Sequence, residues 1–265
     1  MVLKKVPTTI SILGCGWLGE PLANYLSANG FKVKGSTTSE EKLHRLIAIG
    51  IETYQLSLES LNETMLPFFD TEILIVNIPS KNIAEFNKLI SFIKKSTIKK
   101  VLFVSSTSVY RDNNRVIYED TTDSFSDSPL LEIEKMFQQN HHFKTTILRF
   151  GGLFGYTRKP GNFFPLGKSI SQPEAPVNMI HRDDSVAIMH QIIQQNKWNE
   201  TFNACADFHP TKREFYTKAT EIVGNPPPNF IVGESLSFKI ISNDKLKKEL
   251  NYTFKHSDIL KALEG

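Results

Sequence analysis

The stretch "ILGCGWLGEPLANYL" (residues 12–26) decides the fold, because three glycines stand between an apolar segment and an amphipathic one. Gly14, Gly16 and Gly19 have the spacing G-x-G-x-x-G. In this pattern the first glycine permits a tight turn, the second leaves no Cβ to block a pyrophosphate, and the third lets the helix pack closely on the strand. The N-terminus of the helix then faces the anion. The stretch therefore predicts a dinucleotide-binding turn, with a purely structural turn as the alternative.

Outside this turn, strand and helix patterns alternate through the first half of the chain. Short apolar segments predict strands, and longer segments with apolar residues at helical spacing predict helices. Because parallel strands need crossover helices, the alternation indicates an α/β fold with a doubly wound parallel sheet of the Rossmann type. The predicted strands are 8–13, 31–36, 52–57, 72–79, 99–106 and 144–150. The predicted helices are 17–30, 39–50 with Ser39 as N-cap, 82–96 and 128–140.

The pattern changes after about residue 150. Residues 151–178 are rich in Gly, Pro and aromatic residues and predict a loop region. We expect residues 1–150 to form a dinucleotide-binding Rossmann core, and residues 151–265 to complete it with strands and helices and to add a small C-terminal substrate lobe. Helices are predicted again at 182–196, 211–224 and 242–251.

Composition excludes several classes of protein. The 265 residues include 31 basic and 28 acidic side chains, and a net charge of +3 gives no electrostatic case for nucleic acid or an anionic membrane surface. Cys15 and Cys205, the two cysteines, predict neither a disulfide framework nor a Cys-based metal site, and we expect no metal. Residues 1–16 do not resemble a signal peptide, and no run approaches about 20 apolar residues. We therefore expect a soluble cytoplasmic protein, monomeric or homodimeric.

The end of the second predicted strand sets the expected cofactor. NAD-binding turns carry Asp or Glu about 20 residues after the first glycine. This sequence has the hydroxyls of Ser36, Thr37 and Thr38 there instead. Hydroxyls tolerate a 2′-phosphate, and Lys42 or Arg45 is placed one helical turn further on to pair with it. NADP is therefore favoured, NAD remains possible, and the alternative is that the hydroxyls only turn the chain.

A row of hydroxyls ends the predicted strand in "VLFVSSTSVYRD" (101–112). Ligands of doubly wound sheets bind beyond the carboxyl ends of the strands, which places Ser105 and Ser106 beside a bound nicotinamide. The segment "SSTSVYRD" resembles the "SSxxVYG" of extended and atypical short-chain dehydrogenases/reductases, with Arg111 in place of the glycine. The resemblance implies that Ser106 is the catalytic serine.

The same resemblance implies a Y-x-x-x-K motif about 25 residues after Ser106. Lys135 stands at the lysine position, where the family's lysine orients the nicotinamide ribose and lowers the pKa of the tyrosine. Leu131 occupies the tyrosine position and has no proton to exchange with a substrate. The alternative for Lys135 is a solvated partner of Glu132 or Glu134. Other candidate proton donors are Tyr110, Tyr118 and Tyr156.

Two later segments extend the resemblance. "LRFGGLFG" (148–155) resembles the segment after the sixth strand, whose backbone passes the nicotinamide. "VNMIHRDDSVAIM" (177–189) resembles the family's "IHxDDxA" segment. There we expect Asp183 or Asp184 to cap a helix N-terminus, and His181 to be structural or at the rim of a pocket.

The C-terminal part resembles one branch of the superfamily. "HPTKREFY" (209–216) and "KIISNDKLKKELNYTF" (239–254) are similar to the YeeZ-like branch of atypical short-chain dehydrogenases/reductases. That resemblance implies an NAD(P)-binding fold more directly than a reaction. The predicted cofactor-binding residues are Gly14, Cys15, Gly16, Trp17, Leu18, Gly19, Ser36, Thr37, Thr38, Asn77, Ile78, Pro79, Ser105, Lys135, Phe150 and Gly151.

Basic residues mark the predicted substrate side. Arg158 and Lys159 are placed to hold an anionic group, with solvated loop charges as the alternative. Arg149 ends a predicted strand, and we expect it to have an anionic or carbonyl partner.

Three functions are compatible with these patterns. The first is an NADP-dependent oxidoreductase or an enzyme like the NAD-dependent epimerases/dehydratases, which acts on an unknown small molecule through Ser106 and Lys135. The second, favoured by Leu131, is an NADP(H)-binding sensor or assembly module without turnover. The third is a two-domain dehydrogenase of the pyrroline-carboxylate-reductase kind, which shares the glycine turn but lacks "SSxxVY".

Overall fold

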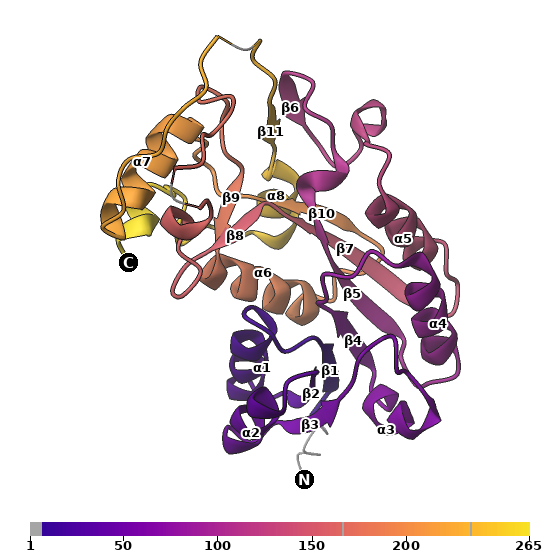
Figure 1. Cartoon of the computed structure of the whole chain (residues 1–265). Helices are drawn as coiled ribbons and strands as arrows, with labels where there is room; N and C mark the ends of the chain where they lie inside the picture. The colour runs from indigo at the N-terminus through magenta and orange to yellow at the C-terminus, as the bar shows by residue number, and fades with distance from the viewer. Residues whose placement is uncertain (1–6, 166, 234) are drawn as a thin grey trace. The chain divides into compact units, whose positions relative to one another are not determined.

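The computed structural model describes residues 7–165, 167–233 and 235–265 (Figure 1). Residues 1–6, which belong to the predicted core and to the segment judged unlike a signal peptide, lie outside the described part. The chain divides into two compact units, each built from separate segments. The first unit comprises Met1–Ser105, Ser128–Ile147 and Ile192–Glu200. The second unit comprises Ser106–Asp127, Leu148–Gln191 and Thr201–Gly265.

A seven-stranded sheet has the order β10-β7-β5-β4-β1-β2-β3. The pairs β1–β2, β1–β4, β2–β3 and β4–β5 are parallel. The chain therefore proceeds outward in one direction from β1 to β3 and in the other from β4, as in a doubly wound sheet, and this confirms the predicted fold class. The strands are β1 (Thr9–Leu13), β2 (Lys32–Thr37), β3 (Glu52–Gln55), β4 (Ile73–Val76), β5 (Lys100–Ser106), β7 (Lys144–Phe150) and β10 (Thr201–Ala204).

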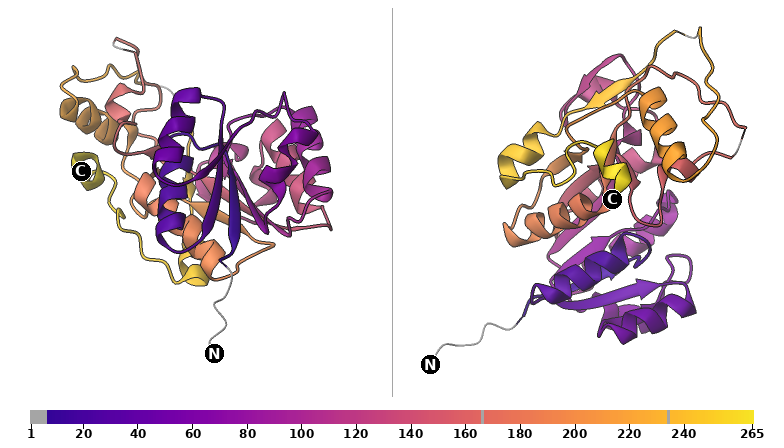
Figure 2. Two further views of the ribbon diagram at one scale, coloured as in Figure 1. Left: turned by 90° about the horizontal axis from the view of Figure 1, so that it is seen from below. Right: turned by 90° about the vertical axis from the view of Figure 1, so that its left-hand side faces the viewer.

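Helices cover both faces of the sheet in the first unit. In the left view of Figure 2, α1 and α2 lie on one side of strands β1–β3, and α4 and α5 lie on the other. Their ends follow from local chemistry: the Ser39 side chain accepts from the backbone N–H of Lys42, as predicted, and Gly30 follows α1 with a φ of 85°. The helices are α1 (Gly19–Ala28), α2 (Glu40–Ala48), α3 (Leu66–Phe69), α4 (Ile83–Lys94) and α5 (Pro129–Gln138), with a short 3₁₀ turn η1 (Glu63–Met65).

The core of the first unit explains why its strands read as apolar. All four residues of β4 are buried. Phe86 of α4, Phe103 of β5 and Phe137 of α5 form a buried aromatic cluster, with ring centroids of Phe103 and Phe137 4.9 Å apart. Strands covered by helices on both faces lose the alternation of polar and apolar residues.

The second unit contains shorter strands that the sequence pattern does not reveal. Parallel pairs join β8 (Gly152–Phe154) to β9 (Met179–His181), and β6 (Arg115–Ile117) to β11 (Lys239–Ile241). Its helices confirm three predictions, and its 3₁₀ turns lie in loops. The helices are α6 (Arg182–Gln194), α7 (Lys212–Ile222) and α8 (Asp244–Leu250). The 3₁₀ turns are η2 (Thr107–Val109), η3 (Thr122–Ser124), η4 (Pro160–Asn162) and η5 (Lys261–Glu264).

Among the helices of the described residues, none is long and apolar enough to cross a membrane.

Candidate functional site

The glycine turn joins β1 to α1, and its three glycines have different surroundings. Gly14 has a φ of 102°, and a Cβ there would lie 2.3 Å from the Asn77 carbonyl oxygen. A Cβ on Gly19 would lie 2.2 Å from the Gly14 carbonyl oxygen, whereas a Cβ on Gly16 would meet nothing within 4 Å. The Asn77 amide donates to the Gly14 carbonyl at 2.9 Å and holds the turn. Packing therefore requires the first and third glycines, and open space lies beside the second.

A cleft of about 500 Å³ opens beside this turn. Its walls come from the turn, the end of β2, and the segments after β3 and β4. Its volume lies within the range of small-molecule sites. Of the residues predicted to bind cofactor, those that line the cleft are Gly14, Cys15, Gly16, Thr37, Thr38, Asn77, Ile78 and Pro79. Six further residues of the first unit that were predicted to bind cofactor do not line the cleft: Trp17, Leu18, Gly19, Ser36, Ser105 and Lys135.

The hydroxyls at the end of β2 differ in their roles. Ser36 is buried, and its hydroxyl accepts from the backbone N–H of Gly14 at 3.2 Å. Its carbonyl accepts from Cys15 at 2.7 Å, so Ser36 holds the turn in place. Thr37 and Thr38 line the cleft. Burial raises the pKa of the Cys15 thiol to about 12, which makes this cleft cysteine a poor nucleophile.

One of the two basic residues predicted near the cofactor lines the cleft. Lys42, in the first turn of α2, lies in the wall. Arg45 pairs instead with Glu20, and this hydrogen bond raises the pKa of its guanidinium. Glu59 and Glu85 also line the cleft, and Glu85 accepts from the Ser80 hydroxyl at 2.8 Å. The described part of the cleft wall therefore combines one lysine with two carboxylates.

The end of β5 is bonded to α5 within the first unit. The Ser105 hydroxyl donates to the Glu134 carboxylate at 2.5 Å, and both side chains are buried. Leu131, one turn before Glu134, is 9% exposed. Lys135 is exposed at the next position. The buried side of α5 at this level therefore presents an apolar residue and a carboxylate.

The remaining residues predicted near a nicotinamide belong to the second unit. The Ser106 hydroxyl accepts from the backbone N–H of Ser108 at 3.1 Å and begins η2. Phe150 is buried at the end of β7. The backbone N–H of Gly151 donates to Ala204 at 3.0 Å, and a Cβ on Gly151 would lie 2.6 Å from the Cys205 sulfur.

The candidate tyrosines have distinct environments. Tyr110 is buried; its hydroxyl donates to Asn203 at 2.9 Å and accepts from Arg149, and burial raises its pKa. Tyr118 is exposed, and Tyr156, also exposed, donates to Asp183 at 2.8 Å. Tyr110 is thus part of a packed polar network.

The guanidinium of Arg149 finds its partner in that network. It lies 5.0 Å from the ring centroids of both Tyr110 and Phe125. It also donates to the Tyr110 hydroxyl, so a phenol and two aromatic faces surround this guanidinium. Glu119 interacts with Arg149 electrostatically. Burial raises the pKa of Glu119, and the positive charge of Arg149 offsets part of that rise.

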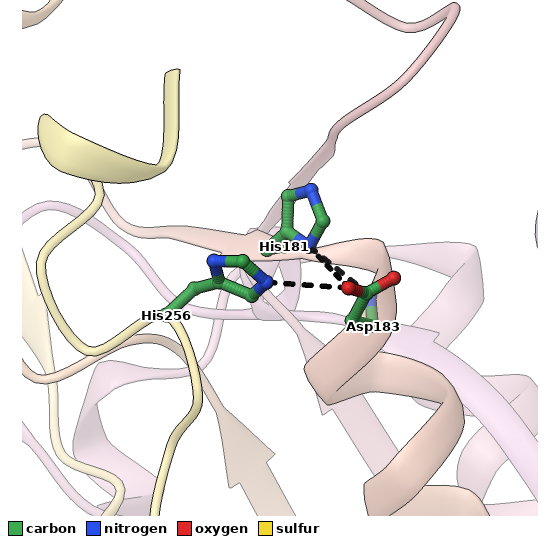
Figure 3. Close-up of side chains that lie close together, drawn as sticks. All are labelled: His181, Asp183 and His256. Carbon is green, nitrogen blue, oxygen red and sulfur yellow. Dashed lines mark hydrogen bonds and ion pairs between the residues drawn. The ribbon is translucent and has the colours of Figure 1, made fainter. Parts of the chain in front are cut away.

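A cluster that the sequence did not reveal joins His181, Asp183 and His256 (Figure 3). The Asp183 carboxylate oxygen Oδ2 lies 3.3 Å from His256 Nε2, 3.8 Å from His181 Nδ1 and 2.9 Å from Lys255 Nζ. Burial lowers the pKa of His181 to about 4. Burial raises the pKa of Asp183, but hydrogen bonds led by the one from Lys255 bring it down to about 2. The cluster therefore holds a neutral imidazole and an ionised carboxylate at neutral pH.

The prediction that Asp183 or Asp184 caps a helix is wrong. Helix α6 begins at Arg182, so both residues lie inside its first turn. Asp184 accepts from the backbone N–H groups of the segment that carries His256. The His181 ring accepts from the backbone N–H of Asp183 at 3.2 Å. Long-range partners therefore occupy the carboxylates, and the histidine satisfies the helix terminus.

A known protein family matches the part of the chain that contains the glycine turn. Residues 9–126 match the family described as the NAD binding domain of 6-phosphogluconate dehydrogenase. Protein YeeZ of Escherichia coli (strain K12) is 30% identical to this chain over 274 residues, which cover 97% of this chain and 98% of YeeZ.

Solved structures share the fold at low sequence identity. A UDP-glucuronic acid 4-epimerase from Bacillus cereus, in complex with UDP-4-deoxy-4-fluoro-glucuronic acid and NAD, has a TM-score of 0.79 at 16% identity, with 97% of each chain covered. A short-chain dehydrogenase/reductase superfamily protein from Agrobacterium tumefaciens with bound NAD has a TM-score of 0.77 at 16% identity, with 97% of this chain and 94% of that chain covered. These likenesses confirm the fold. Since the match to YeeZ spans nearly the whole of both chains, this chain belongs to the YeeZ family, with a Rossmann fold like that of short-chain dehydrogenases/reductases.

Proposed function

We propose that the protein binds NADP(H), with its pyrophosphate at the glycine turn and its adenosine half in the cleft of the first unit. The observation that carries the proposal is the contrast among the glycines. A Cβ is excluded by packing at Gly14 and Gly19, whereas at Gly16 there is open space toward the cleft. No neighbouring protein atom would clash with a side chain at Gly16, so packing does not explain this glycine. A phosphate bound at the N-terminus of the helix would explain it, because the phosphate needs the space that a side chain would fill.

The preference for the 2′-phosphate rests on the end of β2. Thr37 and Thr38 offer hydroxyls at this strand end, where the chain itself carries no carboxylate, and Glu59 and Glu85 line the cleft from other segments. Lys42 lies in the same wall and supplies the positive charge. A lysine–phosphate contact is a charge-assisted hydrogen bond, which is stronger than a neutral one.

For the chemistry, we propose an oxidoreductase or epimerase-like reaction on a small molecule. The nicotinamide supplies hydride transfer when it is bound. Ser106 hydrogen-bonds the reacting oxygen of the substrate, Lys135 orients the ribose, and a proton donor other than position 131 completes the site. These roles rest on the resemblance of the two positions to those of short-chain dehydrogenases/reductases.

A second candidate is NADP(H) binding without turnover. The specific observation in its favour is the packing around α5: Leu131 is buried, Ser105 is bonded to Glu134, and Lys135 is exposed. A helix face arranged in this way stabilises the fold without presenting a proton donor.

Cofactor choice is tested by fluorescence titration with NADPH and NADH. Lys42→Ala removes the charge but keeps the backbone N–H that the Ser39 cap accepts. It should weaken NADPH binding at least about tenfold, the loss of about 1.4 kcal/mol, and leave NADH binding within about twofold. Lys94→Ala, in the last turn of α4 and exposed, is the matched control. The assignment of Lys42 to the 2′-phosphate is contradicted if Lys42→Ala weakens the binding of NADPH and of NADH equally. It is also contradicted if the wild type binds NADH more tightly than NADPH.

A further inference from the structure

We propose that His181, Asp183 and His256, all in the second unit, form a binding site for a divalent transition-metal ion such as Zn²⁺ (Figure 3). One ligand atom from each residue lies within 4.8 Å of the others. Asp183 Oδ2 is 3.3 Å from His256 Nε2 and 3.8 Å from His181 Nδ1. Tetrahedral ligand atoms about 2.1 Å from Zn²⁺ are separated by about 3.4 Å, so small side-chain rotations would complete the site.

The donor set selects the class of ion. Two imidazole nitrogens and one carboxylate suit Zn²⁺ and its first-row neighbours, whereas Mg²⁺ and Ca²⁺ prefer oxygen ligands throughout. Three protein ligands leave a position open for water or for an oxygen atom of a ligand. The spacing of the three residues along the chain predicts no such site, because His256 lies 73 residues after Asp183.

Packing holds the first imidazole in place. His181 ends β9 and is 3% exposed. Gly155 allows this placement, since a Cβ there would lie 2.4 Å from His181 Nε2, and Phe154 packs edge-on with ring centroids 5.3 Å apart. The Nδ1 atom accepts from the backbone N–H of Asp183 at 3.2 Å, so its lone pair points toward the start of α6. Nδ1 is therefore the unprotonated nitrogen of the ring, and a metal ion would take the place of the Asp183 N–H at its lone pair.

A buried carboxylate holds the second imidazole in place. Asp184 is fully buried and accepts from the Tyr252 hydroxyl at 2.7 Å. It also accepts from the backbone N–H groups of Lys255 at 2.8 Å and His256 at 3.0 Å. These bonds hold the C-terminal segment against the start of α6, so Asp184 is a positioning residue of the kind that orients metal ligands.

An ammonium group now neutralises the shared carboxylate. Lys255 Nζ lies 2.9 Å from Asp183 Oδ2, and the lysine side chain is 69% exposed. Tyr156 donates to the other carboxylate oxygen at 2.8 Å. Since an exposed lysine turns out into solvent at little cost, a metal ion would replace it. Removal of the competing cation should therefore tighten metal binding, which a merely structural ion pair would not do.

The test is titration of the full chain, first freed of metal with EDTA and dialysed, with Zn²⁺ by calorimetry and with Co²⁺ by visible absorption. Wild type should bind one ion and give the intense bands of tetrahedral Co²⁺. His256→Ala and Asp183→Asn should each weaken binding at least about tenfold. Lys255→Ala should tighten it about threefold or more, since the alanine keeps the backbone N–H bonded to Asp184.

Controls separate loss of the site from loss of the fold. His142→Ala, an exposed histidine of the first unit, should bind as wild type does. Circular dichroism without metal should show each variant folded, and Asp183→Asn preserves the shape of the side chain if His256→Ala is unstable. The proposal is overturned if neither wild type nor Lys255→Ala binds Zn²⁺ at about 1 mM, a standard free energy of about −4.1 kcal/mol. Equal binding by wild type and by the folded ligand variants also overturns it.

Discussion

The hydroxyl of Ser105 donates to the carboxylate of Glu134 at 2.5 Å, and this bond joins the end of β5 to α5. Both side chains are buried. Leu131 and Lys135, which stand at the tyrosine and lysine positions of the resembled family, lie on the same helix on either side of that bond. The Ser105–Glu134 pair therefore fixes the segment on which the proposed chemistry depends.

Replacement of Ser105 by alanine should destabilise the fold. The variant removes a hydrogen bond to a buried charged group, which typically contributes about 1.5–3 kcal/mol. Urea unfolding followed by circular dichroism measures the loss. Ser106→Ala, which removes a half-buried hydroxyl that caps a 3₁₀ turn, should cost less, about 0.5–1 kcal/mol. Similar losses in both variants would show that the Ser105–Glu134 bond contributes little.

Turnover distinguishes the two candidate functions. We expect the wild type to oxidise or epimerise a substrate in a screen with NADP⁺, and Ser106→Ala to lower the rate about 10²-fold or more, the usual contribution of a positioned proton-transfer or hydrogen-bonding group. Leu131→Tyr should raise the rate, since it restores a phenol four residues before Lys135. If Leu131→Tyr alone turns over, the natural protein binds cofactor without catalysis.

The capping box at the start of α7 predicts a dependence of stability on pH. Hydrogen bonds from Thr211 lower the pKa of Glu214 below its ordinary value of 4.5. A carboxyl with a lowered pKa in the folded state stabilises the protein above its unfolded pKa, and the contribution disappears as pH falls through the folded value.

The comparison is between wild type and Glu214→Gln. The difference in their unfolding free energies should be constant above about pH 5 and shrink progressively below about pH 4.5. Thr211→Ala should remove only the smaller part of that pH-dependent difference, because alanine keeps the backbone N–H whose hydrogen bond lowers the pKa of Glu214 most. A difference that stays unchanged down to about pH 2 would contradict this account of Glu214.

Long elements with regular periodicity were predictable from the sequence, and short or long-range features were not. Residues 83–94 and 129–138 carry apolar residues at helical spacing behind an Asn or Ser cap, so their helices were predicted. Strand β8 has three residues, too few for a period to stand out. Strand β10 (TFNA) is as long as β4 (ILIV) but lacks its unbroken apolar run, so only β4 was predicted.

The candidate site was predictable to a similar extent. The glycine turn is local, so its geometry followed from its spacing. The position of Arg45 did not, because its partner Glu20 comes from a different helix, 25 residues earlier. Asp183 and Asp184 were predicted as caps because partners that hold them, such as Lys255 and His256, lie far along the chain, 71 and 73 residues later. Side chains whose roles depend on tertiary partners are the ones that local patterns assign wrongly.

The central claim is tested most directly by NADPH binding to wild type and to Gly16→Val. The valine side chain meets no protein atom near its Cβ position, so the variant should fold with unchanged circular dichroism, but its side chain fills the space assigned to the pyrophosphate. Fluorescence titration should show saturable binding by wild type below about 1 mM and a loss of at least about tenfold in the variant. Binding of NADPH by folded Gly16→Val as tight as by wild type, or none by wild type up to about 1 mM, would contradict the assignment of the glycine turn to a dinucleotide.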